Sequence, residues 1–163
     1  MPTVDPDAFK AALGSWAAGV TAVTTRHDGL EYAITASSFS SLSLDPPLIL
    51  VCIANGNTFE TMVRDAKHFA VSILAQGQDD ISNGFARSGR DPLPQLPDVE
   101  TFAMETGSPH IKGAMAHLDC ELEETLNGGD HVIVIGRVVA ASADDSMAPL
   151  MYFRRDYRGL VLD

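Results

Sequence analysis

Alternating apolar and polar positions occur along much of the chain and predict more strand than helix. Residues 20–27 alternate and are rich in Thr and Val, which is typical of a strand. Asp28-Gly29 then predicts a tight hairpin turn, and the returning strand begins near Leu30 and runs into a hydroxyl-rich stretch.

A second and longer hairpin is predicted near the end of the chain. In residues 117–126, Leu118, Cys120 and Leu122 are expected on one face of a strand, with Asp119, Glu121 and Glu123 on the other. The turn at residues 127–130, Asn-Gly-Gly-Asp, leads into a strongly apolar strand over residues 131–141.

Two apolar runs predict further strands, and residues 48–54 form the longer of them. This run, LILVCIA, is continuously apolar, which predicts a strand covered on both faces. Residues 69–74 are also expected to form a strand. Residues 88–97 are rich in Pro, Gly and charge and are expected to form a surface loop.

Three helices are predicted. Asp5-Pro6 is a start signal for a helix over residues 6–16, in which Phe9, Leu13 and Trp16 recur at helical spacing. Asn57 and Glu60 fit a capping-box pattern for a second helix, whose apolar face would be Phe59, Met62 and Val63. Residues 76–86 predict a third, short helix.

This total of six or seven strands and two or three short helices predicts a mainly β protein. The strands are linked by hairpins, and the helices do not alternate regularly with them. The pattern therefore favours an antiparallel barrel with helical additions over a doubly wound sheet, in a single domain spanning residues 1–163.

Composition narrows the classes of partner. The net charge of −11 disfavours nucleic acid and anionic membranes, which repel an acidic surface. The longest apolar run is too short to span a bilayer, and the N-terminal segment lacks the pattern of a secretory signal, so a cytoplasmic protein is expected. Cys52 and Cys120 lie in apolar runs and are expected to be free thiols, since no metal-ligand spacing is present.

No motif for a nucleophile, a metal hydrolase or a phosphate-binding loop occurs in the chain. A protein that uses a redox cofactor needs none of these, because the cofactor performs the reaction. The hydroxyl-rich stretch TASSFSSLSLDPP, residues 35–47, is compatible with such a role. Its short side chains let the backbone approach the edge of a flat ring, although a serine-rich edge strand that satisfies its own backbone would look the same.

Three other segments are candidate binding elements. Asn55 to Thr58 lead into a predicted helix whose N-terminus could bind a phosphate, or Asn57 and Thr58 could simply cap it. His131 follows the tight Gly129-Asp130 turn and could be functional or an ordinary surface histidine. The arginines of FRRDYR, residues 153–158, could attract an anionic cofactor or form a solvated terminal face.

Together these segments resemble the short-chain flavin reductase family, the reductase components of two-component flavin-dependent monooxygenases. The resemblance covers residues 9–157 and rests on motifs in a fixed order: Gly19-Val20-Thr21, TASSFSSLSLDPPL, the apolar strand with Cys52, FAVSIL, Gly113-Ala114, Gly129-Asp130-His131 and Pro149-Leu150-Met151-Tyr152. It implies an FMN-binding split β-barrel, commonly a homodimer, that reduces FMN or FAD with NADH or NADPH.

The resemblance also implies roles for individual residues. The isoalloxazine ring would be lined by Thr35, Ala36, Ser37 and Ser38, and the middle of the flavin by Cys52, Ile53, Ala54 and Asn55. Thr58 would reach the phosphate, and Phe85 would close over the flavin tail or adenine. His131 would contact the nicotinamide, with Tyr152 near the same face. The turn before Thr58 departs from the pattern of many relatives, and Asn57 replaces a more usual Ser.

The expected function is therefore NAD(P)H:flavin oxidoreduction that supplies reduced flavin to a separate flavin-dependent monooxygenase. The absence of a clear basic cluster for a 2′-phosphate favours NADH. Two alternatives stay open: an electron carrier or sensor that holds its flavin tightly, and a related barrel with a non-flavin ligand.

Overall fold

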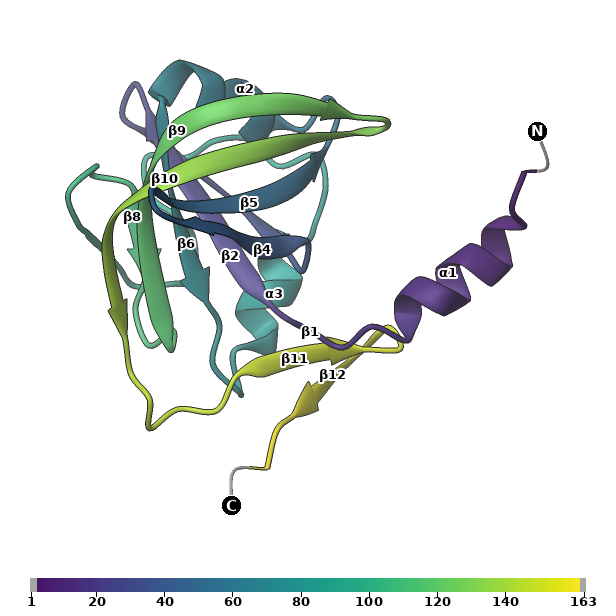
Figure 1. Cartoon of the computed structure of the whole chain (residues 1–163). Coiled ribbons are helices and arrows are strands. Elements are labelled where there is room, and N and C mark those ends of the chain that lie inside the picture. The colour runs from purple at the N-terminus through teal and green to yellow at the C-terminus, as the bar shows by residue number, and fades with distance from the viewer. Residues whose placement is uncertain (1–2, 162–163) are drawn as a thin grey trace.

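The computed structural model describes residues 3–161, which form a mainly β protein with three short helices (Figure 1). The helices are α1 (Pro6–Gly14), α2 (Thr58–Ala66) and α3 (Asp79–Phe85). The strands are β1 (Ala18–Gly19), β2 (Thr21–His27), β3 (Leu30–Ala36), β4 (Phe39–Leu44), β5 (Pro47–Ala54), β6 (His68–Ile73), β7 (Thr101–Ala103), β8 (Pro109–Ile111), β9 (Ala116–Gly128), β10 (His131–Ala143), β11 (Leu150–Phe153) and β12 (Asp156–Gly159).

Seven strands form one antiparallel sheet in the order β3-β2-β6-β9-β10-β5-β4. Its two edge strands, β3 and β4, follow each other in the chain and are joined only through Ser37 and Ser38. Within residues 3–161 these two strands do not pair with each other, so the curled sheet stays open along this line. The predicted antiparallel split barrel is confirmed.

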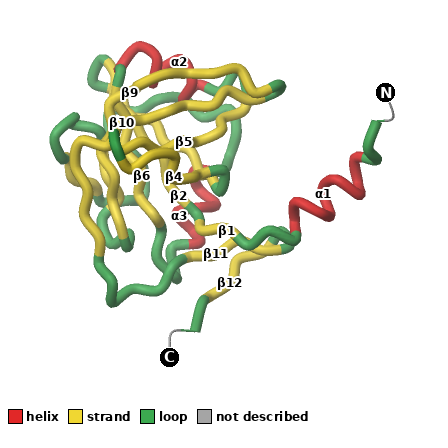
Figure 2. Tube along the Cα trace, in the orientation of Figure 1, coloured by secondary structure: helices red, strands yellow, loops and turns green. Residues whose placement is uncertain are grey.

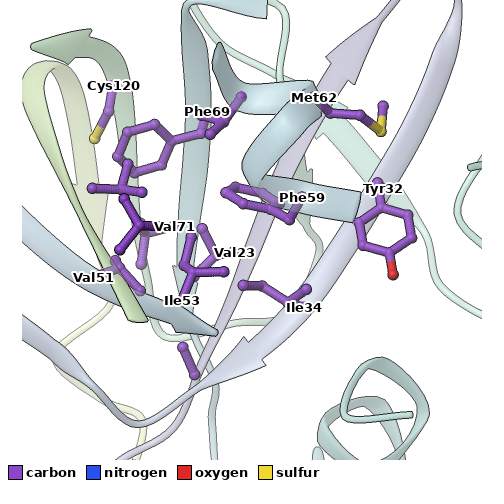
Figure 3. Packing of buried hydrophobic residues seen from close by; sticks show 14 of the residues in the cluster. Val23, Tyr32, Ile34, Val51, Ile53, Phe59, Met62, Phe69, Val71 and Cys120 are labelled. Carbon is purple, nitrogen blue, oxygen red and sulfur yellow. The ribbon is translucent and has the colours of Figure 1, made fainter. Parts of the chain in front are cut away.

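The main core fills the inside of the curled sheet (Figure 3). Alternate residues of neighbouring strands point inward, among them Val23, Ile34 and Val51. Helix α2 packs Phe59 and Val63, both fully buried, against them. Each large apolar side chain buried in this way contributes roughly 1.5–3 kcal/mol relative to exposure, so burial is what holds the sheet in its curled form.

A small sheet and an extended helix lie outside this core (Figures 1 and 2). Strands β1, β11 and β12 form the small sheet, in the order β1-β11-β12. Helix α1 precedes β1 and projects away from the barrel. At the C-terminal end of the helix, the Arg154 N–H donates to the Gly14 carbonyl at 2.9 Å. The helix has no buried residue, although the predicted cap is present: the Asp5 carboxylate accepts from the N–H groups of Asp7 and Ala8.

The structure corrects two predictions about apolar segments. The apolar run at residues 48–54 does form β5, but it is not covered on both faces, because its residues alternate between buried and partly exposed. The first helix ends at Gly14 rather than Trp16. Its apolar residues, predicted from helical spacing, are exposed: Phe9 by 51%, Leu13 by 58% and Trp16, just beyond it, by 77%.

Asp119, which the alternation places on the face of β9 opposite Cys120, is fully buried like Cys120, so both faces of β9 are covered at this point. Strands β7 and β8 form a two-stranded hairpin that covers this part of β9, and the alternation along β9 did not indicate it. The carboxylate accepts hydrogen bonds from the backbone N–H and the hydroxyl of Thr106, at 2.7 and 2.6 Å, and these compensate for its burial.

The helix predictions at α2 and α3 are confirmed, with α3 shorter than expected. The expected loop at residues 88–97 has no helix or long strand, but it is held to β3 by the buried carboxylate of Glu31, which accepts from the Leu96 N–H at 2.9 Å. None of the helices within residues 3–161 is long and apolar enough to cross a membrane.

Candidate functional site

The hydroxyl-rich segment lies directly against the end of β5. The Cys52 N–H donates to the Ser38 carbonyl at 3.2 Å, and the Ser38 hydroxyl donates to the Cys52 carbonyl at 2.8 Å. One residue further along, Phe39 pairs with Val51. The two segments that the sequence analysis assigned to one ligand, residues 35–38 and 52–55, are therefore neighbours in the fold.

The tight turn before β10 is fixed to the same end of β5. The Asn55 N–H donates to the Asp130 carbonyl, and the Asn55 side-chain amide donates to the Gly129 carbonyl, both at 3.0 Å. His131 pairs with Ala54 in the ladder between β10 and β5. We call this arrangement of Asn55 with residues 129–131 the turn clamp. It places His131 next to the segment that follows Cys52.

His131 is oriented by its neighbour in the turn. Its Nδ1 lies 2.7 Å from Oδ1 of Asp130, and 45% of the side chain is exposed. This hydrogen bond, together with the attraction of the imidazole, lowers the pKa of Asp130. A carboxylate at Nδ1 favours the proton on that nitrogen, so Nε2 is left to face outward. The side chain is thus presented to solvent in a defined orientation.

The N-terminus of α2 follows the turn clamp in the chain. The Asn57 side chain accepts from the Phe59 N–H at 2.9 Å, as the capping pattern predicted. Glu60 accepts from the Gly56 N–H at 3.1 Å. Thr58 is partly buried as the first helical residue. The Glu60 carboxylate is also paired with Arg64, whose guanidinium lies 3.2 Å from its Oε1, so the two charges at the start of α2 compensate each other.

A cleft of about 320 Å³ opens beside the hydroxyl-rich segment. It lies between the end of β3, helix α3 and the hairpin of β11 and β12. Its lining includes three Ser or Thr side chains, two tyrosines and one arginine. The complete lining is Val20, Thr35, Ser37, Ser82, Asn83, Ala86, Tyr152, Arg155, Asp156 and Tyr157. The combination of aromatic rings, hydroxyls and a cation suits a flat, polar ligand that bears a negative charge.

A chain of hydrogen bonds fixes one wall of this cleft. The Tyr157 hydroxyl donates to Oδ1 of Asn83 at 3.1 Å, and it lies 2.7 Å from the Ser82 hydroxyl. Since the Tyr157 proton is used on Asn83, Ser82 is the donor to Tyr157. The Thr35 hydroxyl donates to the Ser82 carbonyl at 2.5 Å. These contacts join β3, α3 and β12 around the cleft.

The hydroxyl groups are only in part free for a ligand. Thr35 and Ser38 both donate to backbone carbonyls of the protein, which is what a serine-rich strand satisfying its own backbone would do. Ser37 differs, because its hydroxyl has no hydrogen-bond partner in the part of the chain that the structure describes, and it lines the cleft. Within the hydroxyl-rich segment, backbone groups and the Ser37 hydroxyl are therefore the donors that a ligand can meet.

Other predicted site residues lie apart from one another. Phe85 is 4% exposed and packs in a second apolar cluster around Leu74 and Ile111, with the Arg90 guanidinium over its ring. Ala36 and Ile53 are also buried. Tyr152 lines the cleft beside Thr35, whereas His131 is outside the cleft lining within residues 3–161. The structure does not bring Tyr152 and His131 together in this cleft.

The two thiols differ in their surroundings. Cys120 is buried among apolar side chains, and burial raises the pKa of its thiol to about 12. Cys52 is partly exposed at the end of β5. Both are free, as expected from their spacing, and the backbone of Cys52 is what contacts Ser38.

Several residues of the cleft were not recognised as site residues in the sequence. Ser82 and Asn83 lie on a helix that was predicted, but nothing in its pattern pointed to the end of β3. Tyr157 and Arg155 belong to the FRRDYR segment, whose charge was noticed. The hairpin that brings them to Thr35 joins residues more than a hundred positions apart, so only the tertiary fold could reveal it.

The family of the chain and its fold both point to the class of flavin-dependent oxidoreductases. The chain belongs to the flavin reductase family: residues 13–161 match the family model described as flavin reductase like domain. It is a flavin reductase by this membership.

Individual relatives agree with this assignment. The chain is 40% identical, over 95% of its length and 97% of the relative's, to the reductase component of a 4-hydroxyphenylacetate 3-monooxygenase from Thermus thermophilus. It is 36% identical, over 99% of its length and 90% of the relative's, to an NADH-dependent flavin reductase from a Rhodococcus species.

A solved structure shows the same fold. It is an NADH:FAD oxidoreductase from Streptomyces globisporus, in complex with NAD and FAD fragments. The TM-score is 0.90 with 31% identity, covering 100% of this chain and 99% of the other.

Proposed function

We propose that this protein reduces FMN or FAD with NADH and delivers the reduced flavin to a separate flavin-dependent monooxygenase. The observation that carries the proposal is the turn clamp, in which Asn55 holds the turn before His131 against the segment that also contacts Ser38. The segment from Cys52 to Asn55 thereby connects the residues proposed to bind the flavin with the residue proposed to bind the nicotinamide, His131.

Flavin binding is assigned to the backbone and small side chains around the end of β5. The ring would lie along Thr35, Ala36, Ser37 and Ser38, with Cys52, Ile53, Ala54 and Asn55 along its middle. Small side chains fit this role, because they leave backbone N–H groups open to the polar edge of the ring, where negative charge develops on reduction. Thr58 is proposed for the phosphate and Phe85 for the far end of the flavin.

Nicotinamide binding is assigned to His131, with Tyr152 as a second contact. When both substrates are bound, a hydride passes from the nicotinamide C4 to the flavin N5. The part of the protein is to orient the two rings and to exclude water between them. His131, held by Asp130, positions the carboxamide through Nε2 and is not required as a general acid.

The relatives' names support this proposal. One is named an NADH-dependent flavin reductase and another the reductase component of a monooxygenase, and both are covered over nine-tenths or more of their length. In the solved relative, NAD and FAD fragments are bound. NADH is proposed over NADPH on these names and on the absence of a recognised 2′-phosphate cluster in the sequence.

A homodimer is part of the proposal. Phe9 and Leu13 lie four positions apart on one exposed face of α1, and Trp16, just beyond the end of the helix, is exposed as well. Large apolar groups that are exposed in a single chain favour association, and a second copy would cover them. We name this set the α1 face: Phe9, Leu13 and Trp16.

The test is steady-state oxidation of NADH by the purified protein with added FMN, with FAD and without flavin, followed by nicotinamide absorbance. We expect turnover that saturates with added flavin and is absent without it. NADPH in the same assay should give a lower kcat/KM.

Two outcomes would contradict the proposal. A protein that purifies yellow, keeps its flavin through desalting and gives no turnover with added flavin is an electron carrier or sensor. A protein that binds neither FMN nor FAD, measured by quenching of flavin fluorescence, has a different ligand in the same barrel.

A further inference from the structure

The hairpin of β11 and β12 has an unusual turn. Arg154 and Arg155 form its two central residues, between the paired residues Phe153 and Asp156, and both have positive φ, at 51° and 63°. Glycine and asparagine are the residues that adopt this conformation at low cost in a two-residue hairpin turn. Two arginines therefore occupy positions that backbone preference alone does not favour.

Both arginines line a shallow pocket against α1 that also contains Asp7 and Lys10, but their other surroundings differ. The Arg154 guanidinium lies over the Phe153 ring, 5.0 Å from its centre, and it is outside the lining of the cleft beside the hydroxyl-rich segment. Arg155 lines that cleft, together with Thr35, Ser37 and Tyr152. Among the described residues Arg155 has no ion pair and no side-chain hydrogen bond.

Neighbouring charges leave Arg155 as the cation of the cleft. The one carboxylate in the lining, Asp156, is neutralised by Arg158, which contacts its Oδ2, and its Oδ1 accepts from the Tyr157 N–H at 2.9 Å. The chain as a whole has a net charge of −11, which repels anionic substrates at long range. In this cleft, the unpaired guanidinium of Arg155 beside the free Ser37 hydroxyl compensates locally for the repulsion of anions by the net charge.

The N-terminus of α2 does not supply an equivalent cation. It carries the Glu60 carboxylate, which accepts from the Gly56 N–H, and Asn57 already caps the helix. Arg64 lies 3.2 Å from Oε1 of Glu60, so the one cation near this helix start among the described residues is already paired. An anion in the cleft meets the unpaired Arg155 and the Ser37 hydroxyl.

We propose that Arg155 binds a phosphate group of a substrate nucleotide in this cleft and thereby sets the affinity for that substrate. A guanidinium can donate two parallel hydrogen bonds to a phosphate, and the rings of Tyr152 and Tyr157 offer faces to the rest of the nucleotide. The phosphate belongs to the flavin or to the nicotinamide dinucleotide. The inference rests on the proposed function, since it takes both as substrates.

The test compares Arg155→Gly with Arg154→Gly. Both substitutions remove one positive charge from the same turn and place glycine at a positive φ, so both should keep or raise the melting temperature. Only Arg155→Gly removes a cation from the cleft. The KM of the phosphate-bearing substrate should rise about tenfold or more in Arg155→Gly, with kcat changed less than threefold, and Arg154→Gly should behave like the wild type.

The choice of flavin identifies the source of the phosphate. If Arg155 binds the flavin phosphate, KM rises for FMN and FAD and stays unchanged for riboflavin, which lacks a phosphate. If it binds the nicotinamide dinucleotide, KM for NADH rises with every flavin. The inference would be overturned if the two glycine variants had equal effects, or if no KM changed. It would also be overturned if KM rose equally for riboflavin and FMN while KM for NADH stayed unchanged.

A binding measurement separates this inference from the proposed function. Dissociation constants for FMN and riboflavin, from flavin fluorescence, and for NADH, from its own fluorescence, do not depend on turnover. If the wild type gives no turnover but Arg155→Gly still weakens FMN or NADH binding selectively, the inference holds and the proposed function fails. If no dissociation constant changes in Arg155→Gly, the inference fails whatever the activity.

Discussion

At the scale of single residues, His131 shows how a common side chain acquires a defined role through its neighbours. Its Nδ1 lies on the Asp130 carboxylate, and the turn that carries both is held by Asn55. A histidine with the same kind of neighbour occurs at the end of β2, where His27 lies 3.5 Å from Asp28. The contact of His27 is longer and runs through Nε2, whereas His131 is hydrogen-bonded through Nδ1 at 2.7 Å. His27 therefore serves as a control for the loss of a partly exposed imidazole away from the turn clamp.

We expect His131→Ala to raise the KM for NADH about two- to tenfold, because one hydrogen bond to the nicotinamide is lost. The dissociation constant for flavin should change less than twofold. Steady-state kinetics and flavin fluorescence measure the two quantities, and His27→Ala is the control. Equal losses of flavin binding and NADH use would remove His131 from the nicotinamide site.

Gly136 is a residue where packing, and not a turn, requires glycine. A Cβ at this position would overlap the ring of Phe69, which is fully buried, and would lie 3.0 Å from the Cβ of Cys120. The ring belongs to the main core and cannot move into solvent. The small residue in the middle of β10 therefore makes room for the core side chain of β6.

Gly136→Ala should lower the free energy of unfolding by about 1–3 kcal/mol through overpacking. Urea denaturation measures this, and Gly84→Ala is the control. Gly84 lies in α3 with no atom near its added Cβ, so that change should be neutral or stabilising by up to about 1 kcal/mol. A Gly136→Ala variant as stable as the wild type would show that Phe69 can shift. The double variant with Phe69→Leu should recover part of the loss.

At the scale of elements, the hairpin of β7 and β8 encloses a set of ionisable groups. His110 is fully buried, its ring stacks with Phe102 at 5.3 Å, and its Nε2 lies 3.4 Å from the Asp119 carboxylate. Neither ring nitrogen of His110 makes a hydrogen bond within the described part of the chain. His117 lies edge-on at 5.6 Å, and its Nε2 is 2.8 Å from the Ile111 carbonyl.

Burial lowers the pKa of His110 from its usual 6.5, and the neighbouring His117 lowers it further, whereas Asp119 acts in the opposite direction. Burial likewise lowers the pKa of His68, on β6. A histidine with a lowered pKa in the folded state takes up its proton more readily when the chain is unfolded. Stability is therefore full above pH 6.5 and decreases as the pH falls below it.

We expect the free energy of unfolding to decrease between pH 7.5 and 5.5. The slope should be less steep in His110→Gln, by at most about 1.4 kcal/mol per pH unit, because one titrating group is removed. Urea denaturation at each pH measures the slope. His27→Gln, which removes a partly exposed imidazole, should change the slope less than His110→Gln, because the charge of His27 is only one of several causes that lower the pKa of His68. An unchanged slope in His110→Gln would assign the pH dependence to other groups.

At the scale of the whole molecule, the barrel and α1 have different sources of stability. The barrel buries its own apolar residues, whereas α1, which projects from the barrel (Figure 1), buries none and leaves Phe9, Leu13 and the adjoining Trp16 exposed. Short isolated helices are only marginally stable in water, so a helix of nine residues needs packing from outside itself. A second copy of the chain is the partner proposed here.

Replacing Phe9 and Leu13 together by Gln should weaken self-association by roughly a hundredfold or more, since each buried side chain of this size contributes about 1.5–3 kcal/mol. Glutamine keeps a good helix propensity. Sedimentation velocity over a range of concentrations measures the association. Lys10→Gln, on the same helix, is the control and should associate like the wild type. A wild type that is monomeric at all concentrations would refute the dimer.

The sequence by itself determined the local elements and their hairpin order. Alternation predicted β2 and β9, and the turn signals after them predicted the returning strands β3 and β10. Capping residues predicted the start of α2, because such signals depend on neighbours a few positions away. The resemblance added the family and the site segments around Ser38, Asn55 and His131, which the fold does hold together.

Only the tertiary structure decided which residues share a surface. The burial of Asp119 depends on the cover by β7 and β8, and the exposure of α1 depends on its projection from the barrel. The cleft that contains Thr35 and Arg155 joins residues 120 positions apart. Alternation predicts which residues lie on the same side of one strand. Which part of the protein covers that side depends on long-range packing, and a local sequence pattern does not predict it.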